Sequence, residues 1–178
     1  MSTPTFVGYF AKRRSPSSDW LGAEAVAEIC SVSECIASGP PDWVTAWRHN
    51  EWGFFDTPDL AWSVVPGAAR SDFDLFGYEL FPWRFQAGKE LELRIVAPAA
   101  LPPDADFEAL GFDVVSRTAD SFECSPLSCN AWARVVGANA FCLVDDLEKA
   151  RTLASVAEAE GYEPGDYYVF RVWRRQNA

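Results

Sequence analysis

The chain has 178 residues, of which 49% are hydrophobic, and its 26 acidic side chains against 15 basic ones give a net charge of −11. This length fits one domain, and the apolar content excludes an intrinsically disordered chain. The acidic balance argues against a general nucleic-acid binder, because neutralising phosphates requires a basic face.

The sequence carries no signal for secretion or membrane insertion. No basic stretch followed by an apolar one opens the chain, and no apolar run reaches the roughly 18–20 residues of a membrane span. We therefore expect a cytoplasmic protein with no membrane partner. In that compartment, five cysteines are expected to be thiols or metal ligands rather than structural disulfides.

In the first part of the chain, the residue pattern predicts one strand followed by three helices. Residues 5–10 are typical of a strand, and apolar residues at helical spacing predict a helix over residues 21–32. A short helix is expected to start at Asp42. Thr57, which is followed by a proline, is the expected N-cap of a third helix that ends at Pro66.

The middle of the chain changes to the period of strands. Residues 73–81 predict a strand buried on both faces, and residues 91–95 alternate as a half-buried strand does. Residues 107–110 are expected to form a short helix that a glycine ends. Residues 112–117 and 122–124 predict a hairpin.

The last third predicts a strand, a helix and a closing strand. Residues 141–144 form the first strand, and Asp145 is the expected N-cap of the helix, with a glutamate three residues later completing a capping box. This helix ends at Gly161, and residues 167–173 form the last strand. We predict a single α+β domain over residues 1–178, with a mostly antiparallel sheet, several short helices and one longer C-terminal helix.

Two hexapeptides of similar sequence carry four of the cysteines. The first hexapeptide begins at Cys30 and ends at Cys35, and the second begins at Cys124 and ends at Cys129. Four residues lie between the two cysteines of each pair. Four thiolates from two such turns satisfy tetrahedral zinc, and Pro126 favours a turn in the second hexapeptide. Zinc is therefore the candidate cofactor. The alternatives are buried thiols that only fill the core, and a redox pair.

Aromatic side chains are concentrated in residues 41–85, which hold nearly half of them. Tryptophan is seldom fully buried and is frequent at binding hot spots. The candidate binding residues are Trp43, Trp47, Trp52 and Trp83. The alternative is that these rings pack in the core.

His49 is the only histidine of the chain. A thiol-dependent enzyme would use it as the base for a nucleophile at Cys124 or Cys129. The sequence lacks a G-x-S-x-G motif, a phosphate-binding loop and an H-E-x-x-H motif. The alternative is that His49 caps a helix or makes a surface contact.

Charge is distributed unevenly along the chain. The first 18 residues and the last 12 hold three bases each and no acid, so the whole acidic excess lies between them. We expect the basic ends to lie beside the acidic body. A negative surface steers association toward basic partners, as in acidic immunity or antitoxin-like proteins.

Four stretches resemble a group of small uncharacterised bacterial proteins. These stretches are Phe122–Asn130, Phe141–Leu147, Tyr167–Trp173 and Trp43–Pro66. The resemblance implies a compact cytosolic bacterial protein and brings no activity, cofactor or catalytic residue with it.

Three functions follow from the sequence. The first is a non-enzymatic accessory protein that binds another protein through its acidic, aromatic-rich surface. The second is a domain stabilised by zinc on the four cysteines of the two hexapeptides. The third is a thiol-dependent enzyme that uses His49.

Overall fold

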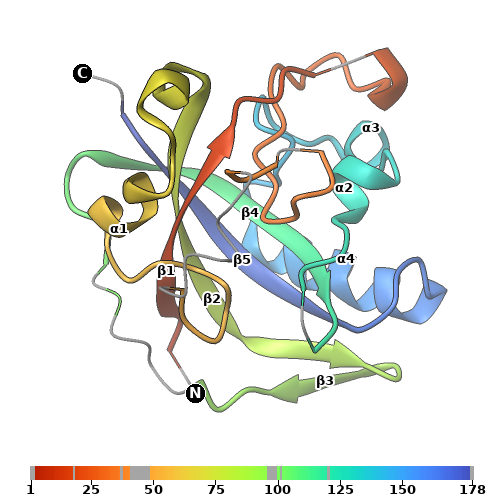
Figure 1. Cartoon of the computed structure of the whole chain (residues 1–178). Helices are drawn as coiled ribbons and strands as arrows, with labels where there is room; N and C mark the ends of the chain where they lie inside the picture. The colour runs from red at the N-terminus through yellow and green to blue at the C-terminus, as the bar shows by residue number, and fades with distance from the viewer. Residues whose placement is uncertain are drawn as a thin grey trace.

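The strands of the computed structural model form one antiparallel sheet (Figure 1). In sheet order the four long strands are β1 (Thr5–Arg13), β2 (Phe73–Gln86), β5 (Asp166–Arg175) and β4 (Phe107–Arg117), and the short β3 (Lys89–Glu92) pairs with the far end of β2. The structure describes residues 3–17, 19–36, 38–40, 49–95, 100, 102–119 and 121–176. The predicted short helix that starts at Asp42 lies outside the described residues.

The helices are short except for the last one. They are η1 (Asp19–Leu21), α1 (Pro58–Ser63), η3 (Gly67–Asp72), α2 (Pro126–Cys129), α3 (Ala133–Val136) and α4 (Leu147–Glu160). The predicted α+β class with a mostly antiparallel sheet and a longer C-terminal helix is therefore confirmed. None of the described helices has the length and apolar content that crossing a membrane requires.

Capping residues that the sequence analysis predicted mark the start of α1 and the end of α4. The Thr57 side chain accepts a hydrogen bond from the Leu60 N–H at 3.3 Å, which caps α1 as predicted. Helix α4 ends as predicted at Gly161, which has a φ of 64°. Its N-cap is one residue later than predicted: Asp146 accepts from the Lys149 N–H, whereas Asp145 accepts from the Asn139 side chain.

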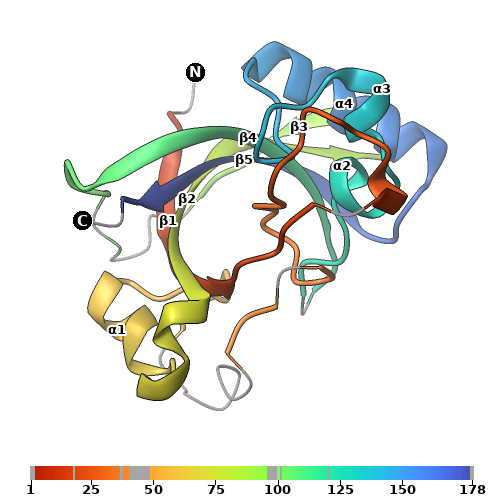
Figure 2. The same cartoon turned by 90° about the horizontal axis from the view of Figure 1, so that it is seen from above.

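The sheet is strongly curved (Figure 2), and buried residues lie on both of its faces. One face packs against α4, and we call its contacts the helix-side core, formed by Phe112, Val114, Tyr167, Val169, Ala150, Leu153, Ala154 and Ala157. The other face packs against irregular chain, and we call its contacts the loop-side core, formed by Tyr78, Val115, Tyr168, Phe170, Cys30, Val32, Phe54 and Phe55. Residues alternate between the two cores along β4 and β5, as side chains of a strand do.

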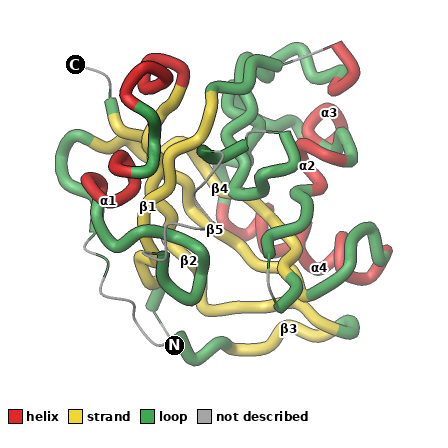
Figure 3. The backbone as a smooth tube through the Cα atoms, in the orientation of Figure 1, coloured by secondary structure: helices red, strands yellow, loops and turns green. Residues whose placement is uncertain are grey.

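The helix predicted over residues 21–32 is wrong. After η1 the chain runs as irregular structure, drawn as a loop in Figure 3. Its backbone N–H groups donate to other segments: Ala27 and Glu28 to the Ala140 carbonyl, and Cys30 to the Phe141 carbonyl. Most of the apolar residues that suggested a helix are buried nonetheless: Leu21, Val26, Ile29 and Val32 are buried, whereas Ala25 is exposed. The segment contributes Ile29 to the helix-side core and Val32 to the loop-side core.

Two further predictions need correction. Residues 107–110 are not a helix but the start of β4, and the glycine expected to end the helix, Gly111, is a bulge in the pairing with β5. Gly111 has a φ of 143°, and a Cβ there would lie 2.9 Å from the Val144 carbonyl oxygen. In the predicted strand 141–144, only Val144 pairs, through an isolated bridge to Phe112.

Candidate metal centre

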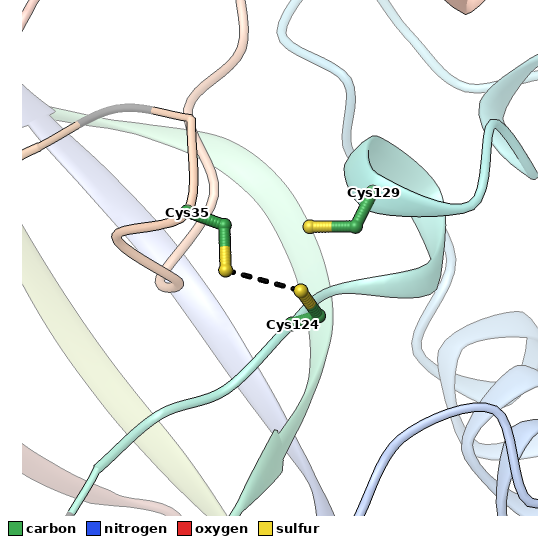
Figure 4. A group of neighbouring side chains, drawn as sticks. All are labelled: Cys35, Cys124 and Cys129. Carbon is green, nitrogen blue, oxygen red and sulfur yellow. Dashed lines mark hydrogen bonds between the residues drawn. The ribbon is translucent and has the colours of Figure 1, made fainter.

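The side chains of three of the five cysteines lie close together, one from the irregular segment that follows η1 and two from the chain around α2 (Figure 4). The sulfur atoms of Cys35, Cys124 and Cys129 all lie within 4.8 Å of one another, and those of Cys35 and Cys124 are 3.0 Å apart. Tetrahedral zinc with Zn–S bonds of 2.3 Å separates its sulfur ligands by about 3.8 Å. The three thiols therefore surround a space that fits one thiophilic ion after small side-chain movements.

Helix α2 places two of the three thiols. Cys124 lies in the chain that leads into α2, and Cys129 is the last residue of the helix. Pro126 occupies the first turn, where its fixed φ suits a helix start, and the Cys129 N–H donates to the Ser125 carbonyl at 2.8 Å. The predicted turn in this hexapeptide is therefore a single helical turn, which brings Cys129 back toward Cys124.

A buried lysine holds the segment that carries the third thiol. Lys12 of β1 is 1% exposed, and its ammonium group donates to the carbonyl oxygens of Ser31, Val32 and Ser33 at 2.7, 2.6 and 2.7 Å. Burial lowers the pKa of Lys12 to about 8, although Glu34 and Asp113 oppose this shift. All three ammonium protons thus find acceptors in the turn before Cys35.

Asp113 of β4 connects the two cysteine-bearing segments through hydrogen bonds to both of them. One carboxylate oxygen accepts from the Ser31 hydroxyl at 2.8 Å and the Val32 N–H at 2.7 Å, and the other accepts from the Ser125 hydroxyl at 2.6 Å and the Val114 N–H at 2.9 Å. Burial raises the pKa of Asp113, while these four hydrogen bonds act in the opposite direction. The carboxylate is therefore the polar centre to which both segments are attached.

The protein itself favours the neutral thiol at this site. Burial raises the pKa of Cys124 and of Cys129, and the neighbouring thiols raise the pKa of Cys124 further. A thiol needs a nearby positive charge to ionise at neutral pH. A bound metal ion supplies that charge, since a coordinating thiol is deprotonated outright.

The structure does not bring Cys30 into this group. Cys30 is 1% exposed and packs in the loop-side core, and burial raises the pKa of its thiol. Four cysteine ligands would require Cys30 and Cys35 to converge, but the irregular segment directs their side chains to different places. Cys142 is likewise 1% exposed and belongs to the helix-side core.

His49 and the tryptophans lie elsewhere. His49 is not part of the thiol group; its Nδ1 lies 3.2 Å from the Asn50 carbonyl oxygen, and the residue lines a cavity of about 390 Å³ together with Trp52 and Phe122. Trp52 packs against the loop-side core and Trp83 against the helix-side core, so these two do not form one groove. Trp43 and Trp47 lie outside the described residues.

The sequence analysis missed Lys12 and Asp113, the residues that organise the site. Asp113 interrupts an apolar stretch of β4, which is the available signal for a buried, partnered charge, whereas Lys12 starts a run of three basic residues and gives no such signal. That signal at Asp113 shows burial but not the partners, because these include hydroxyl and backbone groups of Ser31, Val32 and Ser125, which are distant in sequence.

No protein-family model, curated protein or solved structure matches this chain. The resemblance to small bacterial proteins therefore stays a prediction, and the function is argued from the site itself.

Proposed function

We propose that this protein is a non-enzymatic accessory domain that binds one zinc ion through Cys35, Cys124 and Cys129. The observation that carries the proposal is the convergence of three thiols from two segments that are distant in sequence, since Cys35 and Cys124 are 89 positions apart. Thiolates are soft ligands that select zinc among the common divalent ions. The ion would fasten the loop that carries Cys35 to α2.

Three protein ligands leave the fourth zinc position for another donor. Structural zinc sites have four protein ligands, whereas sites with three keep one position for water or another molecule. In the part of the chain that the structure describes, no histidine or carboxylate joins the three thiols. Water or a group from a partner would therefore complete the coordination.

The thiol-enzyme alternative has less support. A nucleophilic cysteine needs a lowered pKa and a base within hydrogen-bond reach. Burial raises the pKa of both Cys124 and Cys129, and the groups that act on these two thiols are other thiols, serines and backbone rather than His49.

Ion pairs of the C-terminal arginines are consistent with a second role for this protein beside zinc binding, which is the binding of a basic partner. The arginines of the C-terminal strand are paired: Arg171 with Glu79, Arg174 with Glu28 and Glu108, and Arg175 with Asp106. The basic C-terminal end therefore lies beside the acidic body, as expected, and adds no free basic patch. We propose that the acidic surface recognises a basic protein.

Metal analysis tests the zinc proposal directly. Protein purified under reducing conditions should hold close to one zinc ion per chain, and zinc at a hundred times its Kd should stabilise the fold by about 2.7 kcal/mol. Cys129→Ala should abolish the stoichiometric binding. The matched control is Cys30→Ala, which removes a buried thiol outside the group and should leave the zinc content unchanged.

Two results would contradict zinc binding: reduced protein that takes up no zinc, or equal zinc loss in Cys129→Ala and Cys30→Ala. For the acidic binding role, a partner isolated from lysate should be basic and should dissociate as the salt concentration rises. A neutral or acidic partner that stays bound in high salt would contradict it.

A further inference from the structure

We infer that Cys35 and Cys124 form a reversible disulfide that replaces the metal ion, while Cys129 stays a thiol. The observation is the contact between two sulfur atoms, 3.0 Å apart, on segments that the rest of the structure already holds together. A disulfide bond is about 2.05 Å long, so the two sulfurs need to approach by only about 1 Å. The release of metal rests on the proposed function, and the disulfide itself does not.

The backbone around the pair is already positioned for the bond. The Ser33 hydroxyl donates to the Glu123 carbonyl at 2.7 Å, and the Cys35 thiol contacts the same carbonyl at 2.8 Å. The Ser33 hydroxyl also accepts from the Cys35 N–H at 3.2 Å. Hydrogen bonds therefore link the residues next to both cysteines directly, which keeps the two sulfur atoms close to each other.

Accessibility distinguishes Cys35 from the other thiols. Cys35 is exposed, Cys124 and Cys129 are half-buried, and Cys30 and Cys142 are buried. An oxidant therefore reaches Cys35 first. Cys129 lies within 4.8 Å of both, and we base the choice of the pair on the 3.0 Å contact of Cys35 with Cys124 and on the exposure of Cys35.

The chemistry balances with a hydroperoxide as the oxidant. The Cys35 sulfur attacks one peroxide oxygen of hydrogen peroxide and forms a sulfenic acid; the O–O bond breaks, and the leaving hydroxide takes up the Cys35 thiol proton to become water. The Cys124 sulfur then attacks the Cys35 sulfur, the S–S bond forms and the S–O bond breaks, and the leaving hydroxide takes up the Cys124 thiol proton to become a second water. Two thiols lose two electrons, and the peroxide gains them.

Closing the disulfide removes two of the three ligands. The remaining thiol, Cys129, cannot hold zinc alone, so each disulfide formed should release one ion. A small thiol reductant reverses the bond by exchange and restores the site. Metal binding and disulfide formation thus exclude each other at the same two sulfur atoms.

The test treats the full-length chain with hydrogen peroxide and maps its cysteines by mass spectrometry after alkylation. We expect a cross-linked peptide that joins Cys35 to Cys124, with Cys129 alkylated, and one zinc released for each disulfide as followed with a chromogenic chelator. Cys129→Ala should still form the cross-link, whereas Cys35→Ala and Cys124→Ala should not. Reduction should reverse it.

The outcomes separate this inference from the proposed function. Zinc binding by the reduced protein without a Cys35–Cys124 cross-link on oxidation, or with a Cys124–Cys129 cross-link instead, overturns the inference and leaves zinc binding intact. A Cys35–Cys124 cross-link in a protein that binds no zinc supports the disulfide but overturns both metal release and the proposed function. A cross-linked protein that retains its zinc overturns the mutual exclusion.

Discussion

The two cores of this protein are covered in different ways. On the helix side, α4 buries Ala150, Leu153, Ala154 and Ala157 against the sheet, and a helix satisfies its own backbone hydrogen bonds. On the loop side, the covering chain has no regular structure, so its backbone groups need other partners. Lys12 supplies three donors to this chain, and Asp113 accepts from it.

The difference shows where polar groups are needed inside this fold. Buried backbone groups without a partner are costly, and an irregular segment can be buried only if side chains satisfy them. The helix side achieves burial with small apolar residues, whereas the loop side requires two buried charges. The three thiols lie on the loop side, so the site depends on those charges.

The largest effect is expected from Lys12→Met, which keeps much of the apolar stem but leaves three buried carbonyls without a donor. We expect a loss of about 3–5 kcal/mol in the free energy of unfolding, measured by urea denaturation. The matched control on the helix side is Lys149→Met, because Lys149 is half-buried and donates to the Val136 carbonyl. Its loss should be near 1 kcal/mol. Equal losses in the two variants would contradict the contrast between the two sides.

Asp113→Asn should rank second. The amide nitrogen that replaces one carboxylate oxygen would face two of the four donors that Asp113 now accepts from. We expect a loss of about 3 kcal/mol in the free energy of unfolding. Zinc content should fall as well, since Asp113 holds both cysteine-bearing segments. Wild-type stability in this variant would show that these hydrogen bonds do not organise the loop side.

The pKa of Lys12 predicts a third effect, which depends on pH. The folded protein releases the Lys12 proton near pH 8, whereas the unfolded chain holds it up to the ordinary value of 10.5. Between these values the unfolded state binds more protons, so this group makes the fold more stable as the pH rises. The stability difference between wild type and Lys12→Met should therefore grow by about 2 kcal/mol from about pH 8 to about pH 10. A difference that shrinks over this range would contradict a lowered pKa.

The smallest effect is expected at the start of α4. Asp146→Ala removes the side chain that accepts from the Lys149 N–H at 2.8 Å, and we expect a loss of about 1 kcal/mol by thermal or urea unfolding. Asp145→Ala is the control for the corrected cap position, because Asp145 accepts from Asn139 instead. Its zinc content, and that of Asp146→Ala, should match the wild type. A larger loss in the free energy of unfolding for Asp145→Ala than for Asp146→Ala would show that Asp145 is the N-cap, as the sequence predicted.

The predictable parts of the fold are those governed by local chemistry. The continuous burial of β2, the cap at Thr57 and the glycine end of α4 all follow from residues within a few positions of each other. The predicted helix over residues 21–32 failed because its pattern of apolar residues was real, but the donors of that segment found acceptors in residues 140 and 141. Periodicity indicates which residues are buried, and not which hydrogen bonds they make.

The candidate site also has features that are local in sequence and features that depend on long-range contacts. The α+β class and the two cysteine hexapeptides could be recognised in the amino-acid sequence, because side-chain periods and residue spacing are local properties. The grouping of Cys35 with Cys124 and Cys129, and the burial of Cys30 in the core, depend on long-range contacts of the folded chain. The reason is that buried Lys12 and Asp113, from two different strands, set the path of the loop between Cys30 and Cys35 through hydrogen bonds to its backbone.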